Sequence, residues 1–207
     1  MTEARPRAGR FIVLEGIECS GKSTLLAALA ERLRGECDVV TTREPGGTSL
    51  GDAIRGIVLD GSIDVDALSE ALLMNAARAQ HVRDTIRPAL RAGRTVLCDR
   101  YVESTLAYQG YGRGLDLGML RNLCDAATGG LNPDLTLIVD VPVSVSRERM
   151  RARGSNADRL EREDDAFHER VRGGYVELAK SSAHRLIDGT LAESVVLREA
   201  LGAIDPC

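Results

Sequence analysis

The chain has 207 residues, which suits one α/β domain and is short for two. Its net charge of −4 argues against a nucleic-acid-binding protein, which would normally carry a basic face. No apolar run approaches the roughly 18 residues of a membrane helix, so we expect no membrane partner. The polar first ten residues do not resemble a secretory signal, and five cysteines without paired or metal-like spacing favour a reduced, cytoplasmic protein.

Short strand patterns alternate with longer helical patterns along the chain. Strands are expected at 11–15, 39–42, 95–98, 135–139 and 186–187, and helices at 22–33, about 50–60, 66–91, 167–180 and 192–203. Strands separated by helices of this length form right-handed βαβ crossovers. The pattern therefore predicts an α/β fold with a doubly wound, parallel, five-stranded sheet, and residues 1–207 are expected to form a single domain.

The first strand is followed by the sequence GIECSGKS at residues 16–23, which fits the P-loop pattern G-x-x-x-x-G-K-[ST]. In such a loop the backbone N–H groups and the helix N-terminus face phosphate oxygens. Lys22 would reach the β- and γ-phosphates of ATP, and the Ser23 hydroxyl would bind Mg²⁺. The expected ATP site comprises Gly16, Ile17, Glu18, Cys19, Ser20, Gly21, Lys22, Ser23 and Thr24.

Polar residues also follow the second and third strands. Asp99 ends the strand at 95–98, where a carboxylate linked to the metal belongs, and Arg100 beside it offers a fork for a second phosphate. Arg43 lies in TREPGGT, after the second strand, at another carboxyl end where open α/β sheets bind ligands. A Pro-Gly turn with a solvated arginine is the alternative interpretation of that segment.

Between residues 146 and 172 lie eight arginines, interleaved with acidic residues. Taken alone, such a run is typical of a pair of solvated helices with ion pairs between residues four apart. Gly154, Ser155 and Asn156 interrupt the run, and this break favours a mobile loop in the middle of the segment.

The whole set of motifs resembles the thymidylate kinase family. The matching landmarks are FIVLEGIECSGKST at the P-loop, TTREPGGT, ARAQH at 77–81, DRY at 99–101 followed by S-x-x-A-Y-Q at 104–109, PDL at 133–135, and RARG at 151–154. They run in the family's order from about residue 11 to 190. The P-loop alone would indicate only a superfamily, whereas the ordered series is much more specific.

The resemblance implies a homodimeric P-loop kinase that transfers the γ-phosphoryl group of ATP to dTMP, with Mg²⁺ bridging the ATP phosphates. It implies that Arg43 and Arg100 grip the acceptor 5′-phosphate and that Arg78 reads the thymine edge. Thr190 would lie near the adenine. The expected acceptor site comprises Glu18 near the sugar 3′-hydroxyl, Arg43, Met74, Arg78, Arg100, Ser104, Thr105, Tyr108 against the deoxyribose, and Gln109.

One branch of the family carries an arginine within the P-loop, where this chain has Cys19. The chain resembles the other branch, in which a mobile arginine-rich lid, here at about 150–165, supplies that cation. An arginine that stabilises the transition state of phosphoryl transfer is worth about 10³–10⁵ in rate in other systems. The expected catalytic residues are Lys22, Asp99 and, from the lid, Arg151, Arg153 or Arg159.

Met74 departs from the family, which usually places an aromatic residue four positions before the base-reading arginine. This departure leaves open a kinase for dUMP or a 5-modified pyrimidine deoxynucleotide, and it leaves open Met74 as an ordinary core residue. A non-catalytic ATP-binding regulatory protein is the second alternative, although such a protein has no need of arginines for an acceptor phosphate.

Two further expectations concern cysteine and histidine. Cys19 lies among amides and close to Lys22, an environment that lowers the pKa of a thiol; a sterically hidden, inert thiol is the alternative. His81, His168 and His184 show no metal-like spacing and are expected at the surface or in loops.

Overall fold

The computed structural model describes residues 9–154 and 157–204, and its centre is a parallel sheet of five strands. The strands are β1 (Phe11–Glu15), β2 (Val39–Arg43), β3 (Thr95–Asp99), β4 (Leu135–Asp140) and β5 (His184–Asp188), in the order β2-β3-β1-β4-β5. Every neighbouring pair is parallel. The predicted doubly wound α/β fold is confirmed, and the strand ends differ from the expected ones by no more than two residues.

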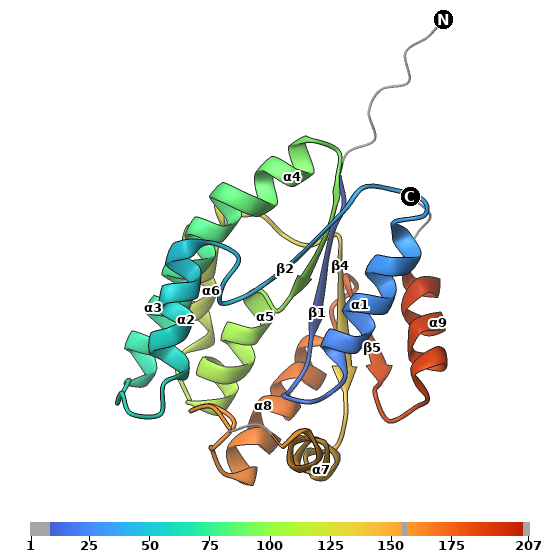
Figure 1. Ribbon diagram of the computed structural model, residues 1–207. Coiled ribbons are helices and arrows are strands. Elements are labelled where there is room, and N and C mark those ends of the chain that lie inside the picture. The colour runs from blue at the N-terminus through green and yellow to red at the C-terminus, as the bar shows by residue number, and fades with distance from the viewer. Residues whose placement is uncertain (1–8, 155–156, 205–207) are drawn as a thin grey trace, which may run out of the picture.

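Alternating side chains of β1 point to opposite faces of the sheet, and each face has its own helices (Figure 1). Ile12 and Leu14 pack with α1 (Lys22–Leu33) and α9 (Glu193–Ala203). Phe11 and Val13 pack with the helical run that ends in α4 (Arg87–Arg91). Both faces of the central strands are thereby buried, which explains their continuous apolar runs.

The helix expected at 66–91 is present as one run with a change of pitch. It consists of α3 (Ala67–His81), a π-helical turn (Val82–Ile86) and α4. The N–H of Arg87 donates to the carbonyl of Val82, five residues earlier. Pro88, which has no N–H to continue the regular ladder, follows immediately. The helix expected at 50–60 is α2 (Ser49–Leu59).

The sequence patterns did not indicate the helices between β3 and β4. These are α5 (Val102–Thr105), the π-helical segment Leu106–Gly112, and α6 (Leu117–Thr128). Their inward faces carry polar side chains such as Thr105 and Gln109, both buried, which break the apolar period of a helix.

The charged segment forms α7 (Val143–Arg153) and α8 (Asp165–Leu178), so the helical interpretation of it was correct for both ends. Most of its arginines, however, bond to other elements instead of to residues one turn away; Arg172, for example, pairs with Asp140 of β4 at 2.8 Å. Ser155 and Asn156, where the mobile loop is expected, lie outside the described residues. Within the described ranges, no helix has the length and apolar character needed to cross a membrane.

Candidate active site

The P-loop connects β1 to α1 at the carboxyl edge of the sheet. Gly16 has a φ of 137°, and a Cβ there would lie 2.3 Å from the carbonyl oxygen of Val139 on the neighbouring strand, so only glycine fits. Gly21, with a φ of 106°, begins α1. Lys22 turns back over the loop and donates to the carbonyls of Gly16 at 2.9 Å and Ile17 at 2.7 Å.

Lys22 is enclosed by the site, with 6% of its surface exposed. Burial, and next the positive charge of Arg100, lower the pKa of the Lys22 ammonium to about 8. An anion placed over the loop would reverse this effect, because it would stabilise the charged form.

Ser23 and Asp99 place oxygen atoms beside the P-loop. The Ser23 hydroxyl donates to Asp99 Oδ2 at 3.2 Å, whereas Asp99 Oδ1 is buried and has no hydrogen-bond partner in the described part of the chain. These are the oxygen donors that a hard cation such as Mg²⁺ prefers. No group of three or more His, Cys, Asp or Glu side chains able to hold a metal occurs among residues 9–154 and 157–204. A cation here would therefore take most of its ligands from phosphate and water.

Arg100 adopts a left-handed backbone conformation with a φ of 76° at the end of β3. Its guanidinium donates to Glu18 Oε1 at 3.0 Å, to the Tyr108 hydroxyl at 3.2 Å and to the Tyr175 hydroxyl at 3.0 Å. Burial raises the pKa of the Glu18 carboxyl, but the positive charges of Arg100 and Lys22 outweigh burial, so the pKa is lowered. Glu18 is therefore an anionic acceptor that also takes a short hydrogen bond from Tyr108.

Arg78 is held from several sides by buried groups. Its Nε donates to Glu44 Oε2 at 2.7 Å, and its Nη1 donates to Asn75 Oδ1 at 2.9 Å and Thr105 Oγ1 at 3.0 Å. Its Nη2 donates to the carbonyl of Tyr101 at 2.7 Å. The guanidinium is thus fixed in one orientation.

The surface placement expected for the histidines is wrong for His81 and His168, which are 0% and 2% exposed. His81 Nδ1 lies 2.9 Å from Glu44 Oε1 and its Nε2 lies 2.7 Å from Thr42 Oγ1, so it supports the carboxylate that holds Arg78. His168 Nδ1 lies 3.5 Å from Glu18 Oε2. Burying these carboxylates requires polar neighbours, and histidine supplies them.

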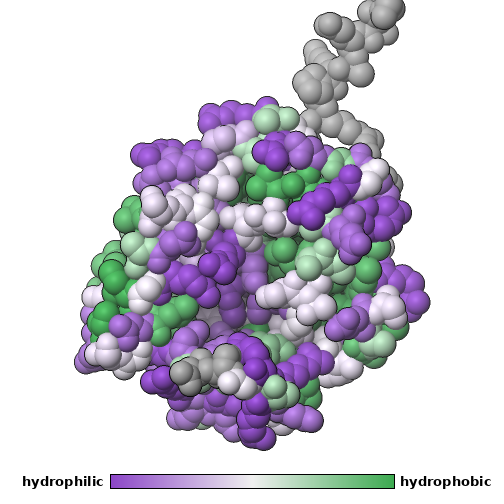
Figure 2. Space-filling view, in the orientation of Figure 1, coloured by the Kyte–Doolittle hydropathy of each residue, from purple (hydrophilic) through white to green (hydrophobic). Residues whose placement is uncertain are grey.

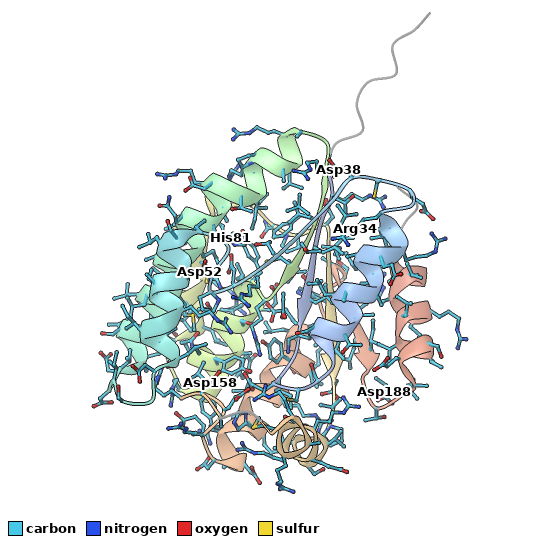
Figure 3. The ribbon with its side chains drawn as sticks, in the orientation of Figure 1. Arg34, Asp38, Asp52, His81, Asp158 and Asp188 are labelled. Carbon is cyan, nitrogen blue, oxygen red and sulfur yellow. The ribbon has the colours of Figure 1, made fainter. Side chains whose placement is uncertain are left out.

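A cavity of about 210 Å³ lies between the P-loop, α3 and the segment after β3. In Figure 2 this region is a hollow in the front face with hydrophilic residues around it. Figure 3 shows Asp158 at its lower rim, on the segment that follows α7. The predicted site residues that line it are Glu18, Cys19, Lys22, Ser23, Met74, Arg78, Asp99, Arg100, Ser104, Thr105, Tyr108 and Gln109.

A second cavity, of about 680 Å³, lies on the other side of the P-loop, between α1 and the loop after β5. Its predicted lining residues are Cys19, Ser20, Gly21, Lys22, Ser23, Thr24 and Arg153. Thr190 itself is exposed and bonds to Asp188, while its neighbours Gly189 and Leu191 line the cavity. Arg149, which the sequence interpretation missed, donates to the carbonyl of Gly189 at 2.8 Å.

Arg43 does not line either of these cavities. It borders an open hollow with Ser23, Asp52 and Asp99. The smaller cavity instead contains Arg55, which the motifs did not indicate. Burial, and next the nearby charge of Arg43, lower the pKa of Arg55. Arg55 lies on the same face of α2 as the buried Gly51 and Val58, where the helical period predicts an apolar residue. A charged residue at such a position was the signal in the sequence that could have identified Arg55 as a site residue.

The three candidate lid arginines lie in different surroundings. Arg153 donates from Nη2 to both carboxylate oxygens of Glu161, at 2.9 and 2.8 Å, beside the P-loop cavity. Arg159 instead pairs with Glu70 and donates to the carbonyl of Val58 at 2.9 Å. Arg151 is exposed.

The expectation of a lowered thiol pKa at Cys19 is wrong. Burial of the side chain raises the pKa of the thiol, and the charge of Arg153 opposes this only in part. Cys19 also has a positive φ of 52°. Cys98 and Cys124 are buried, and Cys37 is half-buried.

The sequence left open whether Met74 faces the acceptor base or is an ordinary core residue, and its position has features of both. Its half-buried side chain packs against core residues of α2 and α3 and also lines the smaller cavity, on the same helix as Arg78. A thioether is therefore available there to lie against a flat ring.

Comparison with known proteins places this geometry in a family. The family model described as thymidylate kinase matches residues 14–199. The chain is 48% identical to the thymidylate kinase of Deinococcus radiodurans over 199 residues, covering 95% of this chain and 96% of that one. It is 53% identical to that of Thermomicrobium roseum over 189 residues, with 90% of each chain covered. The crystal structure of thymidylate kinase from Ehrlichia chaffeensis superposes with a TM-score of 0.77 at 33% identity, over 96% of this chain and 99% of that one. The chain belongs to the thymidylate kinase family.

Proposed function

We propose that this protein transfers the γ-phosphoryl group of ATP to dTMP, giving ADP and dTDP. The observation that carries the proposal is that the two cavities share three lining residues, Cys19, Lys22 and Ser23. A donor nucleotide in the larger cavity and an acceptor in the smaller one would therefore meet over the same lysine. Phosphoryl transfer requires the two nucleotides to be held close together in this way.

On the acceptor side, Arg100 and Arg55 are the cations that would hold the 5′-phosphate, with Arg43 at the edge of the site. The acceptor phosphate oxygen would attack the γ-phosphorus as the bond to the β-phosphate oxygen breaks. Lys22 would neutralise the charge that develops on the phosphoryl oxygens.

Mg²⁺ is the proposed cofactor, held by the ATP phosphates together with the Ser23 hydroxyl and, directly or through water, Asp99. When bound, it would neutralise charge on the β- and γ-phosphates. The unpartnered Asp99 Oδ1 supports this assignment.

Residues 150–165 are proposed as the lid, with Arg153 as its cation. Arg153 lies beside the P-loop, whereas the guanidinium of Arg159 is directed to Glu70 and to the carbonyl of Val58. A segment that covers the site would also exclude water and so limit hydrolysis of ATP.

We also propose that the protein works in the cytoplasm, as one domain that spans residues 1–207. Recovery of the protein with membranes after cell fractionation would contradict the location. Limited proteolysis that released an independently folded fragment would contradict the single domain.

The reaction is tested by measuring ADP release with each nucleoside monophosphate in turn. We expect turnover with dTMP to exceed that with dUMP, to stop when EDTA removes the metal, and to return with Mg²⁺. Lys22→Met should abolish it, because the phosphates lose their cation, while the exposed Lys180→Met control keeps it. Stronger turnover with dUMP would favour a kinase for another pyrimidine deoxynucleotide. A rate of ADP release that no acceptor increases would favour a non-catalytic, ATP-binding regulatory protein.

The role of Arg153 is tested by Arg153→Gln. A cation that acts on charge developed in the transition state should lower kcat by about 10³-fold and leave the KM for dTMP nearly unchanged. Arg151→Gln is the control and should have little effect, because this arginine, two residues earlier in the same helix, lines neither cavity. A change confined to either KM would show that Arg153 only binds.

The pH dependence follows from Lys22. Before ATP binds, the pKa of Lys22 is about 8, below its ordinary 10.5, and bound phosphates raise it. ATP binding is therefore linked to proton uptake above pH 8, so the KM for ATP should be constant below that pH and rise above it, by up to about tenfold per pH unit. Initial rates between pH 6.5 and 9.5 measure this, and a flat KM up to pH 9.5 would count against it.

A homodimer is proposed through α2 and α3, which expose Leu50, Ile57, Leu68 and Leu72 at 41–49%. This apolar surface lies over those helices at the left edge of Figure 2. Leu72→Glu should shift the protein from dimer to monomer in sedimentation velocity, because it buries a charge at the contact. Leu186→Glu, at a similarly exposed leucine of β5, should leave the dimer intact. A wild-type monomer would contradict the proposal.

A further inference from the structure

Glu70 is a fully buried carboxylate that does not line either nucleotide cavity. It lies in the first turn of α3. Its Oε1 accepts a hydrogen bond from Gln109 Nε2 at 2.6 Å. Its Oε2 accepts from Arg159 and, at 3.4 Å, from Arg113. Two guanidinium groups thus match its charge, and one neutral amide completes its surroundings.

The bond to Gln109 decides which end of that amide faces the cavity. An ionised carboxylate can only accept hydrogen bonds, so it must face the NH₂ group of the amide and not its oxygen. Gln109 lines the acceptor-side cavity, and its Oε1 has no protein donor anywhere in the described chain. The amide oxygen is therefore the group left for a ligand.

We propose that Glu70 is a specificity-determining positioning residue, which fixes the Gln109 amide so that its oxygen, and not its NH₂, meets the acceptor base. This assignment rests on the proposed function, because it takes the smaller cavity as the site of the base. Thymine and uracil carry a hydrogen-bond donor at N3, whereas cytosine carries an acceptor there. An oriented amide oxygen accepts from the former and repels the latter.

Arg159 and Arg113 hold the carboxylate in this role. Arg159 also donates to the carbonyl of Val58 at 2.9 Å, and Arg113 also pairs with Glu163 at 2.7 Å. Both cations are anchored on second partners, so the Glu70 carboxylate cannot follow the amide if the latter rotates. The orientation of Gln109 is thereby determined on the side away from the cavity, by Glu70 and its two arginine partners, which do not contact the base.

The experiment compares dTMP with 5-methyl-dCMP, which keeps the 5-methyl group and changes only the N3 and C4 positions. The ratio of the two dissociation constants is measured by titration calorimetry, so it does not depend on turnover. Glu70→Gln replaces the carboxylate by an amide that can donate as well as accept, which frees Gln109 to rotate. We expect the preference for dTMP to fall about tenfold, the effect of one lost hydrogen bond of average strength.

Two variants serve as controls. Glu177→Gln makes the same chemical change at an exposed carboxylate of α8, which pairs with Lys180, and should leave the preference unchanged. In a Gln109→Leu background, Glu70→Gln should have no further effect on the preference, because Glu70 acts through that amide.

An unchanged preference in folded Glu70→Gln, or an equal loss of affinity for both nucleotides, would overturn the assignment. If thermal unfolding shows that Glu70→Gln does not fold, Gln109→Leu decides alone: a preference equal to that of the wild type overturns the proposal, and a fall of about tenfold supports it. Wild-type protein that binds dTMP selectively but does not phosphorylate it would contradict the proposed function and not the role of Glu70.

Discussion

The active site depends on one buried carboxylate, that of Glu15 at the end of β1. It accepts hydrogen bonds from the Tyr101 N–H at 2.7 Å, the Ser104 N–H at 3.1 Å, the Ser104 hydroxyl at 2.6 Å and the Tyr175 hydroxyl at 2.9 Å. These bonds join β1, the turn after β3 and α8 at one point. They also hold the chain that directly follows the left-handed Arg100, a conformation that costs about 1–3 kcal/mol and persists only where its surroundings determine it. Burial, and next the negative charge of Glu103, raise the pKa of the Glu15 carboxyl, because both disfavour its charged form. The four hydrogen bonds together offset this cost of burying the carboxylate, which no single bond would cover.

The cations of the site are matched by acceptors of the protein itself. Lys22 donates to P-loop carbonyls, Arg100 to Glu18, and Arg153 to Glu161. Incoming phosphate oxygens compete with these acceptors, so the net gain from each new contact is smaller than its direct strength suggests. The same pairing lets a protein with a net charge of −4 concentrate positive charge at one edge of its sheet without destabilising the fold.

The parts of the molecule that could be predicted from the sequence are those set by local rules. The P-loop is a contiguous motif between a strand and a helix, and the strands are continuous apolar runs, so both were located to within two residues. Arg55 and Arg149 were missed because their roles depend on which elements lie opposite them. His81 was misplaced for a related reason: its environment is created by Glu44, which is distant in the sequence and adjacent only after folding. The thiol of Cys19 shows the same limit, since a charge nearby in the sequence lowers a pKa only if burial does not outweigh it.

The side chain of Arg78 is already ordered in the folded protein, so a ligand does not have to supply the free energy that orders it. A guanidinium has five N–H groups, and in Arg78 four are directed at oxygen acceptors of the protein, which leaves one on Nη2 for a ligand. A free arginine side chain holds about 2 kcal/mol of rotamer entropy, and a ligand that had to order it would lose much of the strength of its hydrogen bond. Here the ordering is completed during folding, at the expense of stability. A ligand that accepts a hydrogen bond from the remaining N–H therefore does not bear the cost of ordering the side chain.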